Sequence, residues 1–240
     1  MKLSVIIPVY NEERTILQLL KKVVAAPLPK NVKLEIVVVD DGSRDKSWKI
    51  ATSFQKKHAK LDMVVLRQPK NRGKGAAIRT GLSAATGNVL MIQDADLEYD
   101  PVQYLALLEP ILKRKAHVVY GTRLKTYPLH LVGKHRTPLF THYLGNKFLT
   151  FMTNILYHSN LSDMETCYKV FTRQALHGVT IASNRFEFEP EITAKLLKKK
   201  ISIVEIPITV SPRGYDDGKK ISWKDGFSAL WTLVKYRFND

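Results

Sequence analysis

The chain has 240 residues, 45% of them hydrophobic and 25% charged, which is the composition of an ordinary globular protein with one large domain. Its single cysteine, Cys167, excludes an internal disulfide and fits a reducing compartment. No apolar run reaches the roughly 18 residues of a membrane-spanning helix, and the apolar N-terminal stretch is too short for a signal peptide. We therefore expect a cytoplasmic protein that is soluble or lies on a membrane surface.

The formal net charge is +16, which favours an anionic partner such as nucleic acid, a lipid headgroup or a phosphorylated ligand. The basic residues occur in scattered pairs and triplets, without a known nucleic-acid motif or a basic stretch interleaved with stacking aromatics. The charge pattern thus predicts a membrane surface or a phosphate-bearing ligand, and no nucleic-acid partner.

The first hundred residues alternate between apolar strands and amphipathic helices. Strands are predicted at residues 3–9, 34–39, 63–66 and 89–92, and helices from a cap at Asn11 to Val24 and over residues 47–57 and 76–85. Such alternation predicts βαβ units with right-handed crossovers, and therefore an α/β fold with a mostly parallel sheet flanked by helices.

The second half is less regular. Its predicted elements are a helix over residues 101–115 that Pro110 can kink, a strand at 117–120, a long loop at 124–141, a helix at 144–156 and a strand at 168–171. They continue with a helix to which residues 185–191 lead and which ends at residues 198–200, a strand at 201–208 and a final amphipathic helix from Trp223.

Three carboxylates, Asp94, Asp96 and Glu98, follow the apolar strand at 89–92. Open α/β sheets bind ligands at the carboxyl ends of their strands. In an extended tip these side chains would share one side, where they would repel each other unless a cation lay among them. Mg²⁺ or Mn²⁺ suits such a ligand set. A solvated acidic turn explains the pattern equally well.

Two further polar clusters follow the predicted strands. Residues 40–43, Asp-Asp-Gly-Ser, form either a simple turn or a ligand-binding tip. Residues 71–75, Asn-Arg-Gly-Lys-Gly, match neither the ATPase phosphate loop nor the dinucleotide fingerprint, and Lys74 within them is either a surface charge or a ligand contact.

Taken together, these stretches resemble the family 2 inverting glycosyltransferases of GT-A fold, and most closely the polyprenyl-phosphate (dolichyl-phosphate) hexosyltransferases. The stretches that carry the resemblance are residues 4–12, 38–43, 71–75, 94–98, 121–123, 145–146, 163–166, 212–214 and 218–220. The resemblance implies a single GT-A domain over residues 1–240. Its parts would be a nucleotide-sugar half at 1–122, an acceptor half at 123–222 and an amphipathic helix at 223–240.

The resemblance also assigns residues to the donor, a nucleotide sugar such as GDP-mannose or UDP-glucose, and to a Mg²⁺ or Mn²⁺ cofactor. Residues that would contact the nucleotide sugar are Pro8, Tyr10, Glu12, Asp41, Lys74, Asp94, Ala95, Asp96, Arg213 and Lys220. Asp96 and Glu98 would be the metal ligands, although related mannose synthases often have glutamine at the position of Glu98.

On the acceptor side, the resemblance places Arg123 and Arg136 at a lipid phosphate. A phosphate monoester has a second pKa near about 6, so it is already an anionic nucleophile at neutral pH and needs guiding arginines instead of a base. A sugar hydroxyl would need a carboxylate base, for which Asp163, Glu165 and Glu187 are the candidates. The predicted catalytic residues are Asp96, Arg123 and Asp163.

The prediction is thus a metal-dependent transfer of a hexose from a nucleotide sugar to a polyprenyl phosphate, by a peripheral protein at the cytoplasmic face of a membrane. Two alternatives remain: a glycosyltransferase that uses a sugar hydroxyl acceptor, and a basic non-catalytic protein that binds membrane or nucleic acid. The final helix, with Phe227 and Trp231, would either pack on the sheet or lie in a bilayer interface. The oligomeric state is left open.

Overall fold

A computed structural model describes residues 1–123, 140–211 and 223–239. The predicted ligand contacts Arg136, Arg213 and Lys220 lie outside these ranges. Within α5 and α7, the side chains of residues 140–142 and 223–224 are also outside the description.

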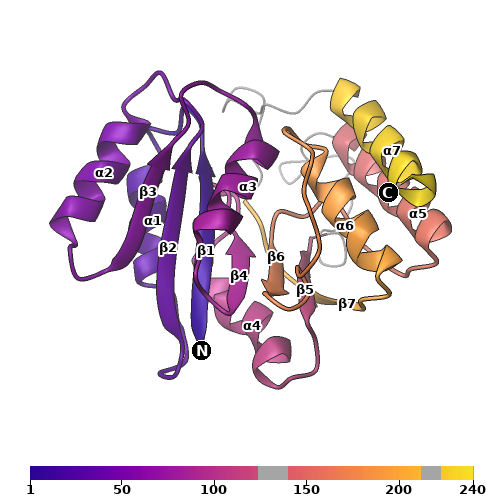
Figure 1. Cartoon of the computed structure of the whole chain (residues 1–240), viewed down its shortest axis with the longest axis horizontal. Coiled ribbons are helices and arrows are strands. Elements are labelled where there is room, and N and C mark those ends of the chain that lie inside the picture. Colours follow the sequence, from indigo (N-terminus) through magenta and orange to yellow (C-terminus); the bar gives the residue numbers. More distant parts are fainter. Residues whose placement is uncertain (124–139, 212–222, 240) are drawn as a thin grey trace, which may run out of the picture.

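One twisted sheet forms the centre of the described chain, with the strand order β3-β2-β1-β4-β6-β5-β7 (Figure 1). The strands are β1 (Lys2–Val9), β2 (Lys33–Asp40), β3 (Asp62–Arg67), β4 (Val89–Ile92), β5 (Val118–Thr122), β6 (Lys169–Thr172) and β7 (Ile203–Pro207). Strands β1 to β4 pair in parallel, β5 and β7 are parallel to each other, and β6 is antiparallel to both of its neighbours. The predicted mostly parallel α/β sheet is therefore confirmed.

The antiparallel strand β6 determines which loops meet. Because β6 runs opposite to both β4 and β5, those two strands point the same way. The carboxyl ends of β1, β2, β4 and β5 and the amino end of β6 therefore lie at one edge of the sheet. The polar clusters at residues 40–43, 71–75 and 94–98 gather at this edge.

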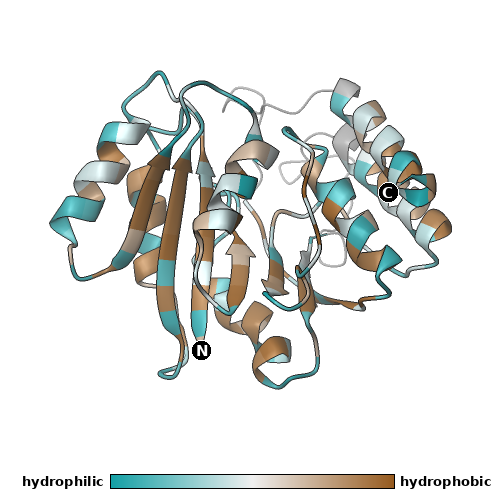
Figure 2. Cartoon of the chain, in the orientation of Figure 1, coloured by the Kyte–Doolittle hydropathy of each residue, from teal (hydrophilic) through white to brown (hydrophobic). Residues whose placement is uncertain are grey.

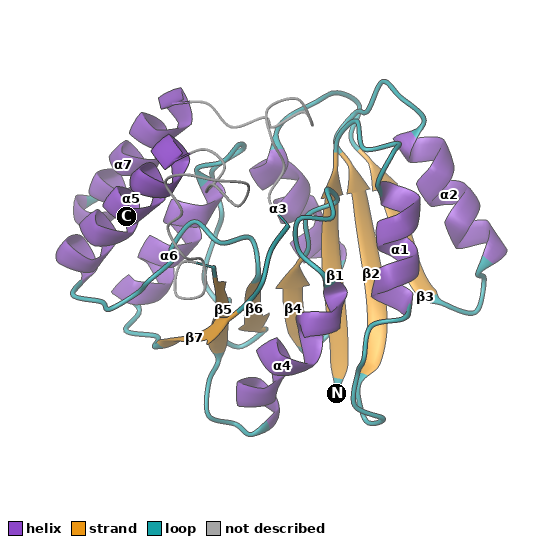
Figure 3. Cartoon of the chain, turned by 180° about the vertical axis from the view of Figure 1, so that it is seen from behind, coloured by secondary structure: helices purple, strands orange, loops and turns teal. Residues whose placement is uncertain are grey.

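Helices cover both faces of the sheet. They are α1 (Ile16–Val24), α2 (Ser47–Lys57), α3 (Lys74–Ala84), α4 (Tyr104–Leu112), α5 (Phe140–Tyr157), α6 (Phe188–Lys198) and α7 (Trp223–Phe238), with a short 3-10 helix, η1 (Pro101–Gln103), before α4. Helix α3 lies on one face and α1 on the other (Figures 1 and 3). The strands are strongly hydrophobic, as Figure 2 shows, because the sheet is buried between these layers.

Helix α5 begins at Phe140, inside the predicted loop and four residues before the predicted start, and two further helix predictions were wrong in their starts. Helix α1 begins at Ile16, not after Asn11, which adopts a left-handed φ of 54° and accepts a hydrogen bond from the Arg44 N–H at 2.9 Å. The chain after Pro101 first forms η1, which the side chain of Asp100 caps at the Val102 N–H. In both places a side chain serves a neighbouring loop or turn, which local periodicity does not reveal.

The final helix α7 packs against α5 and α6. Leu233 and Ala229 are buried there in a small second core with Leu149 and Met164. This contact joins the C-terminal helix to the segment that precedes β6.

The opposite edge of the sheet contains a buried carboxylate, Glu35. It accepts hydrogen bonds from the Ser4 hydroxyl and from the Thr86 N–H (2.8 Å) and hydroxyl (2.5 Å), and pairs with Lys2 Nζ at 2.7 Å. Burial alone would raise the pKa of Glu35, but these partners lower it to about 2.

Candidate active site

The acidic tip after β4 is a turn rather than an extended strand end. Leu97 has a left-handed φ of 64°, and the Glu98 N–H donates to Asp96 Oδ1 at 3.1 Å. Gln93, fully buried, anchors the turn: its amide accepts from Tyr104 and Tyr168, each at 2.8 Å, and donates back to the turn's own carbonyl groups. The three carboxylates therefore do not line up as an extended tip would place them.

Asp94 is instead neutralised by Lys74, the first residue of α3. Lys74 Nζ lies 2.9 Å from Asp94 Oδ1 and 2.9 Å from Glu189 Oε1 at the start of α6. Burial would lower the pKa of Lys74, but the two carboxylates outweigh it and raise the pKa well above its ordinary value. Lys74 is thus a fixed internal cation, and its reading as a surface charge was wrong.

Asp96 and Glu98 are the remaining carboxylates at the tip, and both are half-buried. Within the described residues, no group of three His, Cys, Asp or Glu side chains is placed to hold a metal ion. Two carboxylates nevertheless fit a Mg²⁺ or Mn²⁺ ion whose other ligands are substrate phosphates and water. The donor set therefore suits a metal that arrives with a diphosphate.

Asp41 holds the glycine-rich loop over the end of β2. Its buried carboxylate accepts from the N–H groups of Arg72 (2.9 Å) and Gly73 (2.7 Å), and burial raises its pKa despite these bonds. Gly73 requires glycine, since its φ is 100° and a Cβ would lie 2.4 Å from the Asn184 carbonyl oxygen. Asp41 is therefore a structural anchor of this edge, and its contact with a nucleotide remains a prediction.

The ends of β1 and β2 are tied to each other. The Asn11 N–H donates to Ser43 Oγ at 3.0 Å, and the Glu12 N–H donates to Ser47 Oγ at 2.7 Å. Pro8 and Tyr10 are half-buried at the same edge, whereas Ala95 is buried in the core. The structure thus brings the residues that are predicted to contact the nucleotide's base and ribose to one side of the acidic turn.

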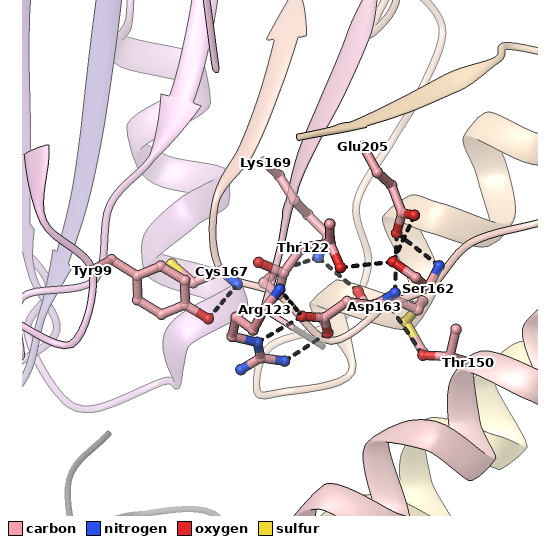
Figure 4. Close-up of polar contacts among 11 residues, drawn as sticks. Tyr99, Thr122, Arg123, Thr150, Ser162, Asp163, Cys167, Lys169 and Glu205 are labelled. Carbon is pink, nitrogen blue, oxygen red and sulfur yellow. Dashed lines mark hydrogen bonds and ion pairs between the residues drawn. The ribbon is translucent and has the colours of Figure 1, made fainter. Parts of the chain in front are cut away.

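Arg123 and Asp163 form a bidentate ion pair at the carboxyl end of β5 (Figure 4). Arg123 Nε donates to Oδ2 and Nη2 to Oδ1 of Asp163, each at 2.8 Å, and the Arg123 backbone N–H donates to Oδ2 at 2.9 Å. Asp163 is fully buried, whereas the Arg123 side chain keeps 18% exposure. Asp163 thus orients the guanidinium.

A second set of polar contacts fixes the segment that carries Asp163. Glu205 on β7 accepts from the Ser162 N–H (2.8 Å), the Ser162 hydroxyl (2.7 Å) and the Asp163 N–H (3.0 Å). The Met164 N–H donates to Thr150 Oγ1 of α5 at 3.0 Å (Figure 4). The arginine is therefore positioned through β7 and α5 as well as by its own ion pair.

Beneath this pair lies a buried charged cluster of Glu165, Lys169 and Glu189. Lys169 is fully buried, donates to the carbonyl groups of Met164 (2.9 Å) and Thr166, and lies 4.5 Å from the centre of the Tyr120 ring. Within the described chain, Glu165 Oε1 and Glu189 Oε2 have no hydrogen-bond partner. Burial and the nearby Glu189 carboxylate raise the pKa of Glu165, and burial lowers that of Lys169.

Glu189, Lys169 and Glu205 were missed as site residues by the sequence reasoning. The available signal was a charged residue inside an apolar strand, at Lys169 in β6 and Glu205 in β7. The N-cap residue Glu187 forms no capping hydrogen bond and accepts from Ser228, while Glu189 pairs with Lys74.

The segment after β7 returns to the acidic turn. Val210 forms an isolated antiparallel bridge with Tyr99, and the Ser211 N–H donates to the Glu98 carbonyl at 2.9 Å. Ser211, the last described residue before the stretch that contains Arg213 and Lys220, therefore lies beside the predicted metal ligand Glu98.

The fold and the family match agree that the chain is a glycosyltransferase. A family model described as glycosyl transferase family 2 matches residues 4–179, and the chain belongs to that family. The sequence resemblance to it is thereby confirmed.

Its relatives include a dolichyl-phosphate beta-glucosyltransferase of Trichomonas vaginalis, 31% identical over 90% of this chain and 66% of that protein. A dolichol-phosphate mannosyltransferase of Pyrococcus furiosus is 30% identical over 91% of this chain and 59% of its own length. A hexosyltransferase of low-salt glycan biosynthesis from Haloferax volcanii is 30% identical over 98% and 52%. The chain thus spans about half to two thirds of the length of these relatives.

Among solved structures, glucosyl-3-phosphoglycerate synthase of Mycobacterium tuberculosis with UDP superposes with a TM-score of 0.73 at 18% identity, covering 100% of this chain and 81% of that one. The same enzyme with Mn²⁺, UDP and glucosyl-3-phosphoglycerate gives a TM-score of 0.67 at 20% identity, with the same coverage. At this identity the match establishes the fold, and it confirms the predicted GT-A architecture.

Proposed function

We propose that this protein transfers a hexose from a nucleotide sugar to a polyprenyl phosphate, with inversion at the anomeric carbon and with Mg²⁺ or Mn²⁺ as cofactor. The observation that carries the proposal is the Arg123–Asp163 pair at the edge that holds the acidic turn. A guanidinium fixed in this way is oriented to meet a phosphate, and a phosphate nucleophile needs no base. The dolichyl-phosphate relatives support the same acceptor.

On the donor side, Asp96 and Glu98 would hold the metal against the diphosphate. When bound, the metal would stabilise the negative charge that develops on the leaving diphosphate. Lys74 adds a fixed positive charge beside the turn, and Arg213 and Lys220 would add others. Pro8, Tyr10, Glu12 and Asp41 would bind the base and ribose, with Asp94 and the Ala95 backbone along the diphosphate path.

A second function, transfer to a sugar hydroxyl, is favoured by one specific observation. Glu165 has a buried oxygen without a hydrogen-bond partner among the described residues, to which a substrate hydroxyl could donate, and it would have to lose its own proton first because burial raises its pKa. Asp163 suits that role less well, because Arg123 occupies both of its carboxylate oxygens. The acceptor therefore distinguishes the two functions.

The test is a transfer assay with Mn²⁺, a short-chain polyprenyl phosphate and, separately, UDP-glucose, GDP-mannose and UDP-N-acetylglucosamine. We expect a glycolipid with one donor, and loss of its formation when the metal is chelated. Arg123→Lys should raise the KM for the acceptor, because lysine cannot form the bidentate contacts. Transfer to a free sugar but to no lipid phosphate, abolished by Glu165→Gln, would replace the proposal with the second function.

A further inference from the structure

Five charged side chains from separate parts of the chain come together at the carboxyl-end edge of the sheet, in what we call the acid–lysine cluster. Its members are Lys74 at the start of α3, Asp94 after β4, Glu165 before β6, Lys169 at the start of β6 and Glu189 in the first turn of α6. Three of the five are carboxylates, although the whole chain is strongly basic.

Glu189 is the centre of the acid–lysine cluster. Its Oε1 lies 2.9 Å from Lys74 Nζ, which also lies 2.9 Å from Asp94 Oδ1. Glu165 and Lys169 are its further neighbours: besides burial, the Glu189 carboxylate is the largest influence on the pKa of each, and it favours the protonated form of both. The cluster reaches the surface at Lys74 and Asp94, whose side chains are 16% and 21% exposed.

Two oxygen atoms of the cluster lack a hydrogen bond within the described chain, namely Glu189 Oε2 and Glu165 Oε1, and both atoms are buried. Glu189 as a whole is only 4% exposed. Buried polar atoms in folded proteins nearly always have a partner, so these two oxygens indicate a group that binds there. Because an ionised carboxylate can only accept, that group must carry O–H or N–H donors.

The charges of the cluster restrict the class of that group. A phosphate does not suit it, since phosphate oxygens are acceptors and three carboxylates would repel them. A metal ion does not suit it either, because the described residues place no three His, Cys, Asp or Glu side chains around one point. A neutral molecule with several hydroxyl groups can donate to both glutamates without adding charge, and a sugar is such a molecule.

The cluster also lies where a transferred sugar has to be. Asp94 precedes the predicted metal ligand Asp96 by two residues. Glu165 follows by two residues the carboxylate that holds Arg123 at the candidate acceptor site. The anomeric carbon of the hexose is bonded first to the leaving diphosphate and then to the acceptor, so the hexose ring must lie between the two. The predicted contacts with nucleotide, metal and acceptor leave the hydroxyl groups of that ring without partners.

We propose that the acid–lysine cluster is the hexose subsite, in which Glu189 Oε2 and Glu165 Oε1 accept hydrogen bonds from hydroxyl groups of the transferred sugar. Lys74 holds the other oxygen of Glu189, so the accepting oxygen has a fixed place. A missing or wrongly oriented hydroxyl leaves a buried carboxylate oxygen unpaired, which makes the two glutamates determinants of sugar specificity. The inference rests on the proposed function for the donor's being a nucleotide sugar.

The test compares the affinity of an intact nucleotide sugar with that of its nucleoside diphosphate, by calorimetry in the presence of Mn²⁺. The pairs are UDP-glucose with UDP and GDP-mannose with GDP. For the pair that matches the enzyme, Glu189→Gln should weaken binding of the nucleotide sugar by about tenfold more than binding of the nucleoside diphosphate. The reason is that an amide has one accepting oxygen, which cannot serve both Lys74 and the sugar. Glu165→Gln should act in the same direction.

Glu191→Gln, on the same helix, is the matched control. The Glu191 carboxylate already accepts from the N–H groups of Ala182 and Ser183, so its loss should leave the ratio of the two affinities unchanged. Nucleotide sugars that each lack one hydroxyl give a second measurement. One such analogue should bind the wild type about tenfold more weakly than the intact sugar does, but should bind the Glu189→Gln or Glu165→Gln variant as well as the intact sugar does.

Glu165→Gln keeps the test valid if Glu189→Gln does not fold, as judged by circular dichroism. Equal losses for nucleotide sugar and nucleoside diphosphate would overturn the proposal, because a change that only loosens Lys74 weakens both. If Glu165→Gln bound the donor as the wild type does but transferred no sugar, Glu165 would be a base and not a sugar contact. Transfer to a sugar hydroxyl alone, with the analogue discrimination present, would contradict only the proposed function. Transfer to polyprenyl phosphate without that discrimination would contradict only the hexose subsite.

Discussion

Carboxylates are buried at both edges of the sheet, but they differ in their hydrogen-bond partners and in the direction in which their pKa values are shifted. At the amino ends of β1 and β2, Glu35 has partners on both of its oxygens, and its pKa falls to about 2. At the carboxyl ends, Glu165 and Glu189 each keep a buried oxygen without a hydrogen bond in the described chain, and the pKa of Glu165 is raised.

The difference separates a structural role from a functional one. A buried carboxylate with every oxygen satisfied stabilises the fold, whereas buried oxygens without partners cost free energy. Proteins keep such groups mainly at sites where a ligand completes them. We therefore expect changes at the carboxyl ends to affect activity more than stability, and the reverse at the amino ends.

The largest effect should come from Asp96→Ala, which removes a predicted metal ligand at the carboxyl-end edge. We expect the transfer rate to fall by about a thousandfold, since charge on the leaving diphosphate loses its stabilisation. The melting temperature should change little. Asp100→Ala is the control: it removes the cap of η1 and the contact with Lys22 Nζ at 2.6 Å, and should lower stability while sparing the rate. Full activity of Asp96→Ala would show that the metal site lies elsewhere.

At the amino-end edge, Glu35→Gln should lower the free energy of unfolding by about 2 kcal/mol at pH 7, measured by urea denaturation. Because the folded-state pKa of Glu35 is about 2, below the ordinary value of 4.5, its contribution is present above pH 4.5 and is lost as the pH falls toward 2. The stabilities of wild type and variant should therefore converge over that range. If Glu35→Gln lowered the transfer rate of the folded protein as well as its stability, the contrast between the two edges would be contradicted.

A smaller effect is expected from Glu189→Gln, which removes one of the two carboxylates on Lys74. The lysine would then lose its fixed place beside the acidic turn, and we expect about a tenfold lower transfer rate. Glu191→Gln, on the same helix, is the matched control. Glu191 binds the N–H groups of Ala182 and Ser183 at 2.8 and 2.7 Å, so its loss should affect stability and not the rate. Equal rates for the two variants would argue against a role for Lys74.

The smallest effect should be that of Glu165→Gln on stability, less than about 1 kcal/mol at pH 5. The folded-state pKa of Glu165 is raised above 4.5, so the folded chain holds this proton longer than the unfolded chain. Stability from this group therefore decreases as the pH rises above about 4.5, and the glutamine variant should remove that part of the slope. Urea denaturation of wild type and variant between pH 5 and neutrality measures this pH dependence of the free energy of unfolding. Glu187→Gln, measured in the same way, is the control. An unchanged slope would show that Glu165 is ionised in the folded chain.

Much of the first half could be predicted from the sequence, because its signals are local. Buried parallel strands are continuous runs of Val and Ile, and helix α2 spans the predicted residues 47–57. The location of Asp41 and Asp96 at one edge of the sheet could be predicted in the same way, since residues that follow parallel strands lie at the same edge.

The second half shows where this reasoning ends. An antiparallel strand inserted between β4 and β5 has no local signature, yet it brings the segment around Asp163 beside Arg123. Phe148 and Leu149 are adjacent apolar residues of one helix, but the first is exposed and the second is buried.

The sequence by itself determined the strands, their polar tips and membership of the glycosyltransferase family, because hydrophobic period and motif spacing are properties of short stretches. Only the tertiary structure decided which charges pair, Lys74 with Asp94 and Glu189 and Arg123 with Asp163, and which side of α5 faces outward. Those outcomes depend on contacts between residues far apart in the chain, whose energies arise only when the sheet and its helices are assembled.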